Sequence, residues 1–212
     1  MAQNGKLSAS ELASIPGGQL AIEAAAAWNA PGGPADANLV PTGSESSYRT
    51  LAGQEKQRAF WCGQGKCGNA AVPGTSNHGL GLCVDLKETW MRAWMDEHGG
   101  EFGWRKTEAP SEWWHVNYVG GVDFPTFELM KKGSHGKRVE RITKRLAFIH
   151  KPGGGAYLDR FYETFKQPVV EAVEAFQKDQ KLEVDGVIGP KTAARIHAVF
   201  HRQFEERGPK DG

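Results

Sequence analysis

Two short segments carry the residues whose types and spacing could do chemistry. His78 and Asp85 stand seven residues apart in SNHGLGLCVD, and Glu112 and His115 stand three apart in EWWH. Two imidazoles and one carboxylate form the ligand set of a catalytic zinc site, because three ligands leave the fourth tetrahedral position open to water. A further carboxylate beside that water can act as general base and then as general acid, and we assign this role to Glu112. We therefore predict one Zn²⁺ per chain.

The same residues permit a simpler interpretation when each is taken alone. The chain has seven His residues, and a single His is more often a surface residue or a hydrogen-bonded core residue than a metal ligand. Residues three apart on an ideal strand point to opposite faces. Glu112 and His115 can therefore meet only if Glu112 lies on the loop before the strand of His115, a position that the adjacent Pro110-Ser111 favours.

The two segments together resemble the VanY-type family of zinc D-alanyl-D-alanine carboxypeptidases and their endopeptidase relatives. The family pattern is S-x-H-x-x-G-x-A-x-D followed by E-x-x-H, and the resemblance covers most of residues 15–120. It implies a catalytic Glu112 and zinc ligands His78, Asp85 and His115. Cys83 departs from the pattern, since the family usually has Ala there. Its thiol either lies near the metal or is a small buried group replacing another, and as a true ligand it would make the site closed and structural.

A third segment supplies candidate substrate-binding groups. The stretch SSYRT resembles the S-x-Y-R segment of the same family, in which the Arg binds a substrate carboxylate, and this implies that role for Arg49. A guanidinium presents a planar donor fork that suits a carboxylate, and near zinc it could also stabilise an oxyanion. The alternative is an ordinary surface ion pair. The other predicted substrate-binding residues are Tyr48, Gln54, Ser76 and Trp114.

The helices and strands predicted around these groups indicate an α+β fold for the first part of the chain. Periodicity and composition indicate helices over residues 19–29, 53–61 and 88–98 and short strands over 80–86, 102–104 and 113–119. We expect a small antiparallel sheet with flanking helices that carries the zinc site. The stretch 62–76 is loop by composition.

The last part of the chain predicts a small all-α domain of three helices. Helical spacing covers residues 138–149 and 169–178, and a third helix should follow Gly189 with Pro190 at its first position. The run VVEAVEAFQKDQKLEVDGVIGPKTAARI resembles the peptidoglycan-binding three-helix domain, whose signature is an AVxxFQ helix followed by DGxxGPxT. The predicted wall-binding residues are Asp185, Gly186 and Gly189.

Charge divides the chain in the same way. Residues 1–130 hold 9 Lys and Arg against 14 Asp and Glu, a net charge of −5, whereas the remainder holds 17 against 11, a net of +6. We predict a zinc peptidase domain over 1–130, a basic linker over 131–138 and a peptidoglycan-binding domain over 139–205. A basic domain suits retention on an anionic wall polymer and raises the local concentration of cleavable peptide.

Composition also limits the partners. The net charge of +1 does not point to nucleic acid, and the longest apolar runs stay below the 18 residues that membrane insertion needs. Three Cys form a sparse set, so we expect reduced thiols, although Cys62 and Cys67 are close enough to pair if oxidised. We expect a monomer that acts on bacterial peptidoglycan.

The predicted function is a zinc-dependent peptidoglycan endopeptidase that cuts the murein stem or cross-link. The first residues lack the basic and apolar regions of a Sec signal peptide. We therefore expect a bacteriophage endolysin, held in the host cytoplasm until it is released to the cell wall. Trimming a terminal D-Ala leaves cross-links intact, which favours an endopeptidase. A D-alanyl-D-alanine carboxypeptidase in wall remodelling and a non-catalytic wall-binding protein remain the alternatives.

Overall fold

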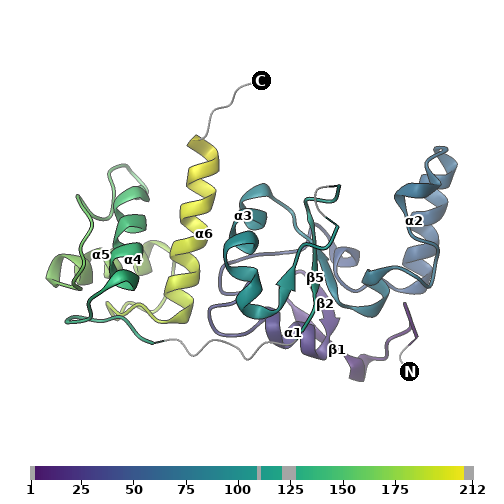
Figure 1. The fold of residues 1–212 in the computed structure, drawn as a ribbon, viewed down its shortest axis with the longest axis horizontal. Helices are drawn as coiled ribbons and strands as arrows, with labels where there is room; N and C mark the ends of the chain where they lie inside the picture. The colour runs from purple at the N-terminus through teal and green to yellow at the C-terminus, as the bar shows by residue number, and fades with distance from the viewer. Residues whose placement is uncertain (1–2, 109–110, 121–127, 208–212) are drawn as a thin grey trace. The chain divides into compact units, whose positions relative to one another are not determined.

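The structure is a computed structural model that describes residues 3–108, 111–120 and 128–207. The chain forms two compact units (Figure 1): residues 1–30 with 39–124, and residues 31–38 with 125–212. The short segment 31–38 was not expected in the second unit. Within that unit Arg195 Nη2 donates to Asn38 Oδ1 at 2.7 Å. The domain and linker boundaries given above stay predictions.

A three-stranded antiparallel sheet forms the centre of the first unit, in the order β3 (Cys83–Asp85), β5 (His115–Tyr118) and β4 (Trp104–Arg105). In the pairing of β3 with β5, Asp85 stands opposite His115 and Val84 opposite Val116. Val84 and Val116 are fully buried. Because side chains alternate along a strand, Asp85 and His115 share the other face of the sheet.

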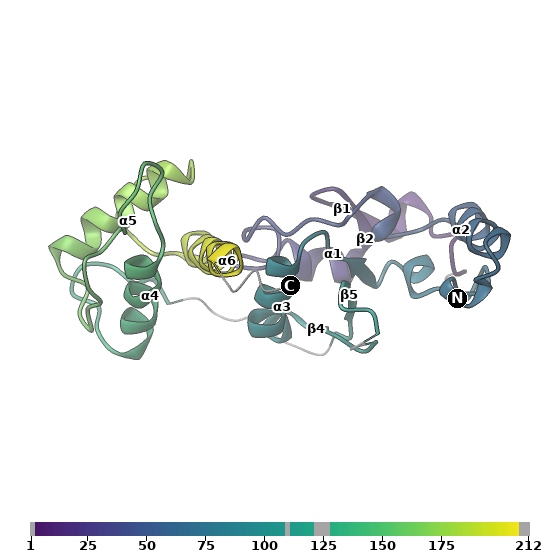
Figure 2. The same cartoon turned by 90° about the horizontal axis from the view of Figure 1, so that it is seen from above.

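Three α-helices accompany this sheet: α1 (Ile22–Trp28), α2 (Leu51–Gly63) and α3 (Thr89–His98). In both views β5 lies between α3 and α2 (Figures 1 and 2). The rings of Trp28 and Trp104 meet edge to face at 5.0 Å between centroids. The largest fully buried side chains of this unit are Trp28, Trp94, Trp104, Leu20, Leu39 and Leu86. The predicted α+β class is confirmed.

The N-terminal part of the predicted helix 19–29 was wrong. Residues Gly18–Ala21 form strand β2, which pairs with β1 (Leu12–Ile15) in a hairpin, and the helix begins only at Ile22. The turn follows from Pro16-Gly17: proline suits the first central position of a tight turn, and Gly17 takes a φ of +82° at the second. The Ala-rich stretch that predicts a helix is helical only after the hairpin, from Ile22 onward.

All three predicted strands are shorter than expected, and the one predicted over 113–119 covers only His115–Tyr118. Residues Asn77–Leu80 form a 3₁₀ helix that ends at Gly81, so β3 starts at Cys83. Phe102 belongs to a second 3₁₀ helix, Gly99–Phe102, and β4 follows it. The remaining 3₁₀ helices are Ala9–Glu11, Ser44–Ser46 and Cys67–Asn69.

The expectation of reduced thiols was wrong for two of the three Cys. Cys62 and Cys67 form a disulfide, and Cys83 is free and buried. Helix α2 runs two residues beyond the predicted end, which places Cys62 in its last turn. The chain then reverses through Gly65, whose φ is +72°, and this brings Cys67 back to the helix end.

The second unit contains the three predicted helices: α4 (Lys137–Phe148), α5 (Gln167–Asp179) and α6 (Pro190–Arg207). Pro190 occupies the first position of α6, where a missing N–H breaks no helical hydrogen bond. The largest fully buried side chains of this unit are Phe165, Phe176, Leu146, Ile149, Ile188 and Ile196. None of the helices in the described part of the chain combines the length and the apolar character needed to cross a membrane.

The substitution Gly81→Ala is expected to lower the free energy of unfolding. Gly81 has a φ of +67°, and a Cβ there would lie 2.6 Å from the backbone nitrogen of Ala21. We expect a loss of about 1–3 kcal/mol, measured by urea unfolding. Gly68→Ala is the matched control, since a Cβ at Gly68 meets nothing within 4 Å. Equal midpoints for the two variants would contradict this account.

Candidate metal centre

The three predicted zinc ligands converge at the edge of the sheet. The carboxylate of Asp85 lies between two imidazoles, with Oδ1 2.8 Å from His115 Nδ1 and Oδ2 3.2 Å from His78 Nε2. The two rings are 5.1 Å apart between centroids. His78 comes from the 3₁₀ helix Asn77–Leu80, Asp85 ends β3 and His115 begins β5. Three separate elements therefore deliver three donor atoms to one place.

A backbone carbonyl sets the orientation of His78. The Nδ1 atom of His78 lies 2.8 Å from the carbonyl oxygen of Ser47. Because a carbonyl can only accept, Nδ1 must carry the hydrogen, and Nε2 is left facing Asp85. Metal-binding His residues are commonly held in this way, with the second nitrogen donating to a carbonyl or carboxylate. Nε2 is thus the atom of His78 that would bind a metal.

Electrostatics keep the Asp85 carboxylate ionised. Burial by itself would raise the pKa of Asp85, but the hydrogen bonds from His115 and His78 outweigh it and hold that pKa well below its ordinary value. The pKa of His115 is raised, since its hydrogen bond to Asp85 outweighs the opposing effect of burial. Asp85 therefore offers a charged oxygen donor at neutral pH.

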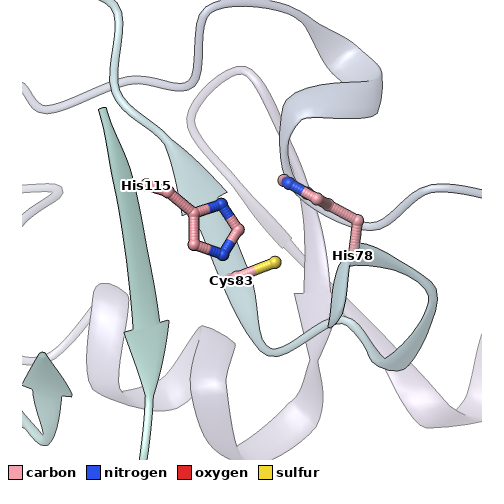
Figure 3. Close-up of side chains that lie close together, drawn as sticks. All are labelled: His78, Cys83 and His115. Carbon is pink, nitrogen blue, oxygen red and sulfur yellow. The ribbon is translucent and has the colours of Figure 1, made fainter. Parts of the chain in front are cut away.

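Cys83 lies close to the same place. Figure 3 shows its sulfur directed toward the gap between His78 and His115, and the ligand atoms of these three residues lie within 4.8 Å of one another. Burial, together with the nearby charge of Asp85, raises the pKa of the Cys83 thiol well above its ordinary value. The thiolate is the ligating form of Cys. A bound zinc would itself favour the thiolate, so His78 and His115 have two possible third partners at the metal, the Asp85 carboxylate and the Cys83 thiol.

The three candidate ligands His78, Asp85 and His115 line a cleft of about 450 Å³. The cleft contains eight of the residues singled out from the sequence: Arg49, Gln54, Ser76, His78, Asp85, Glu112, Trp114 and His115. It also contains residues that the sequence did not single out: Gln57, Trp61, Asn69, Ala70, Ala71, Thr75, Asn77 and Glu108.

Glu112 lies in the turn over residues 111–114, directly before β5. This confirms the loop position that the spacing to His115 required. Glu112 Oε2 is 3.9 Å from His115 Nδ1, and 47% of the side chain is exposed. The carboxylate thus stands beside the metal centre and stays accessible to water in the cleft.

Arg49 is buried at the cleft and is not a surface ion pair. Its residue is 8% exposed, its Nε donates to the carbonyl of Glu45 at 3.0 Å, and its Nη2 lies 3.8 Å from Asp85 Oδ2. Thr50 caps α2 immediately afterwards by accepting from Gly53 N. The guanidinium is thereby fixed at the start of α2 with donors directed into the cleft.

The other predicted substrate-binding residues differ in their roles. Gln54 is 3% exposed, and its amide bonds to Asn4 Oδ1 at 3.0 Å and to Gly74 N at 2.9 Å, so it holds the cleft wall together. Ser76 and Trp114 line the cleft. Tyr48 is not among the lining residues: it is buried, and its hydroxyl accepts from Leu7 N at 2.9 Å.

Glu108 is a site residue for which the sequence carries no motif signal. Its Oε2 accepts from Asn117 Nδ2 at 2.5 Å and lies 3.9 Å from His115 Nε2. Asn117 follows His115 by two on β5 and therefore shares its face. Only its place shortly before EWWH could have suggested Glu108.

In the second unit, the predicted wall-binding residues build a turn. Gln177 is 1% exposed, and its amide bonds to Asp185 Oδ1 at 2.7 Å and to Gly186 N at 3.0 Å. Gly186 has a φ of +67°, and a Cβ there would lie 2.8 Å from Val170 Cγ1. At Gly189 a Cβ would meet only an ordinary contact. Asp185 and Gly186 thus stabilise the turn. Wall binding by Asp185, Gly186 and Gly189 stays a prediction.

Zinc content of variants separates the two possible third ligands. We expect His78→Ala and Asp85→Ala to weaken zinc binding at least about tenfold, and Cys83→Ala to keep it, because two His and one carboxylate complete the ligand set of an open catalytic site. The measurement is zinc per chain by plasma mass spectrometry after dialysis. His135→Ala, an exposed His of the second unit, is the control. Loss of zinc from Cys83→Ala with retention in Asp85→Ala would move the third ligand to the thiol.

Comparison with known proteins finds related chains. Residues 136–196 match the family model of a peptidoglycan binding domain. The chain is 36% identical over 66 residues to a D-alanyl-D-alanine carboxypeptidase of Enterococcus faecalis, and the match covers 24% of this chain and 25% of that relative. The chain thus spans about a quarter of the curated relative's length.

Two solved structures are also similar. One is VanYB in complex with D-alanine-D-alanine, at 26% identity and a TM-score of 0.42, covering 52% of this chain and 77% of that chain. The other is the vancomycin-resistance D,D-pentapeptidase VanY of a VanB-type cassette in complex with Zn(II), at 26% identity and a TM-score of 0.41, covering 52% and 79%. The predicted resemblance is confirmed: the chain is similar to VanY-type D-alanyl-D-alanine carboxypeptidases, and its residues 136–196 match a peptidoglycan-binding domain family.

Proposed function

We propose that this protein is a zinc-dependent peptidase that hydrolyses a peptide bond of bacterial peptidoglycan. The observation that carries the proposal is the convergence of His78, Asp85 and His115 on a cleft that also holds Glu112 and Arg49. When bound by these three residues, zinc would polarise the scissile carbonyl and lower the pKa of water at the open position.

Glu112 would move the proton during hydrolysis. Its carboxylate is half-exposed, and its Oε2 lies 3.9 Å from His115 Nδ1, so it borders both the metal centre and the water of the cleft. It takes a proton from the attacking water and gives it to the leaving amine as the peptide bond breaks. A scaffold without catalysis would have no use for an acid at this place, which argues against a purely wall-binding protein.

Arg49 would orient the substrate. Its Nε is occupied by the carbonyl of Glu45, which fixes the plane of the guanidinium. Arg49 lines the cleft, and its Nη2 lies 3.8 Å from Asp85 Oδ2, so the guanidinium could hold a carboxylate of the peptide or the carbonyl oxygen as negative charge develops on it. The burial of Arg49 strengthens such contacts, since they are shielded from bulk water.

Peptidoglycan is the proposed partner because two independent matches point to it. The second unit matches a peptidoglycan-binding family over residues 136–196, and the curated relative is named for cleavage of D-alanyl-D-alanine. A wall-binding unit on the same chain would raise the concentration of cleavable stems near the cleft. The protein would therefore act while retained on the wall.

Two reactions fit this site. The name of the relative supports a D-alanyl-D-alanine carboxypeptidase. The cleft extends along α2 beyond Arg49, through Gln57 to Trp61, so it has room for more than a terminal dipeptide in either reaction. Cutting inside the stem or bridge, unlike removal of a terminal D-Ala, would break the cross-linked mesh. We favour the endopeptidase, and with it a role in host lysis as a bacteriophage endolysin that reaches the wall from the host cytoplasm.

Replacing the general base separates catalysis from metal binding. We expect Glu112→Gln to keep its zinc and to lower kcat/KM on soluble muropeptides by about 10²- to 10⁴-fold, because the amide cannot take a proton. Glu55→Gln is the control, since Glu55 is exposed on α2 and does not line the cleft. Full activity of Glu112→Gln would rule out the proposed mechanism.

The products of digestion identify the reaction. We expect mass spectrometry of digested peptidoglycan to find new amino termini at internal positions of the stem or bridge. Loss of a single Ala from each stem would instead identify a carboxypeptidase. Zinc-loaded protein that releases neither kind of product would refute both.

A further inference from the structure

One wall of the cleft contains none of the candidate metal ligands and has no part in the proposed chemistry. Its helical side is α2, where Gln54, Gln57 and Trp61 stand three and four residues apart and therefore share one face of the helix. The segment after the helix supplies the rest. We call this surface the α2 wall and define it by the lining residues Gln57, Trp61, Asn69, Ala70, Ala71 and Thr75.

Three covalent or polar ties hold the segment 67–75 against α2. The disulfide joins Cys67 to Cys62 in the last turn of the helix. Arg58 Nη1 donates to the carbonyl of Cys67 at 2.5 Å and also to the carbonyl of Ala70. Farther along, Gly74 N donates to Gln54 Oε1 at 2.9 Å. A segment tied at its start, middle and end is pre-organised, so less entropy is lost when a ligand binds to it.

The chemistry of the α2 wall suits an uncharged peptide backbone. Its six defining residues carry two amides, one hydroxyl, one indole and two methyl groups. Amides and hydroxyls can donate to and accept from peptide groups, and an indole offers a flat apolar surface to small side chains such as Ala. The described Arg, Asp and Glu side chains of the cleft gather at the candidate metal ligands instead: Asp85 is one of them, Arg49 lies 3.8 Å from Asp85, and Glu108 and Glu112 each lie 3.9 Å from His115.

The side of the cleft that α2 forms, from Gln54 to Trp61, is as long as several peptide residues. Gln54 to Trp61 spans seven helical steps, or about 10 Å at 1.5 Å per residue. An extended peptide covers that distance with about three residues. A pocket for a terminal dipeptide could end at Arg49, whereas this cleft continues along the helix.

We propose that the α2 wall is a subsite that binds about three consecutive residues of the wall peptide to one side of the scissile bond. It makes the protein select extended stems over terminal dipeptides. This inference rests on the proposed peptidase function. It also assigns a purpose to the disulfide, which keeps the loop side of the subsite in place.

A series of peptide substrates of decreasing length tests the subsite. The probes are the stem pentapeptide L-Ala-γ-D-Glu-L-Lys-D-Ala-D-Ala and versions shortened one residue at a time from each end, with the cleaved bond identified by mass spectrometry. We expect kcat/KM of the zinc-loaded full chain to fall at least about tenfold when the residues on one side of that bond are removed. Removing residues from the other side of that bond should lower kcat/KM less.

Substitutions test whether the α2 wall causes the dependence of kcat/KM on peptide length. Trp61→Ala and Gln57→Ala should each remove most of the preference for long peptides, chiefly through KM, and Trp61→Phe should restore part of it. Cys62→Ser with Cys67→Ser, or reduction of the wild type, should also diminish it. Lys56→Ala is the matched control, because Lys56 is exposed on the same helix and does not line the cleft.

The possible failures are distinguishable. Cleavage with no dependence on peptide length, or an equal loss on all lengths in Trp61→Ala, would overturn the subsite and leave the peptidase intact. A zinc-loaded wild type that cleaves neither the pentapeptide nor intact peptidoglycan would overturn the proposed function itself.

Discussion

The register between β3 and β5 is the constraint on which the metal centre depends. Asp85 stands opposite His115, and hydrogen bonds from Leu86 N to Trp114 O and from Tyr118 N to Leu82 O continue the pairing at both ends, each at 2.7 Å. A slip of one residue would turn Asp85 to the opposite face of the sheet. The buried pair Val84 and Val116 opposes such a slip, since it would expose both side chains.

The position of His78, the candidate ligand outside these two strands, depends on a different part of the chain. His78 is oriented by the carbonyl of Ser47, and Ser47 is held in turn by β2, because Gln19 N donates to Ser47 Oγ and Tyr48 N donates to the carbonyl of Gln19. Gly18 permits this approach, since a Cβ there would lie 2.1 Å from Ser47 Oγ. The hairpin β1–β2 therefore supports the metal centre without supplying any residue to it.

The cleft combines a charged end with an uncharged wall. At the charged end, Asp85 joins the two imidazoles and Arg49 stands 3.8 Å away, so opposite charges are concentrated where a peptide bond would be polarised. The α2 wall offers only neutral groups on a loop that a disulfide closes. In the proposed function, catalysis and selection of the peptide fall to different elements of the first unit, and binding to peptidoglycan falls to the second unit.

The sequence by itself determined the residue types, the motifs and most elements. The residue types in SNHGLGLCVD and EWWH, with the family pattern that they resemble, indicated the residues that meet. Helical periodicity, with Gly189-Pro190 before the last helix, predicted α4, α5 and α6. These features are local, because the residues that produce them lie within one or two turns of each other along the chain. The loop position of Glu112 also followed from local geometry alone.

Only the tertiary structure decided the features that join distant segments. It brought Ser47 to His78, Glu108 to His115 and segment 67–75 to α2, contacts for which the sequence holds no periodic signal. It also changed the role of Tyr48, which binds Leu7 rather than the cleft, and paired Cys62 with Cys67. Such outcomes depend on which surfaces pack together, since hydrogen bonds and disulfides form between groups that folding has already brought within reach.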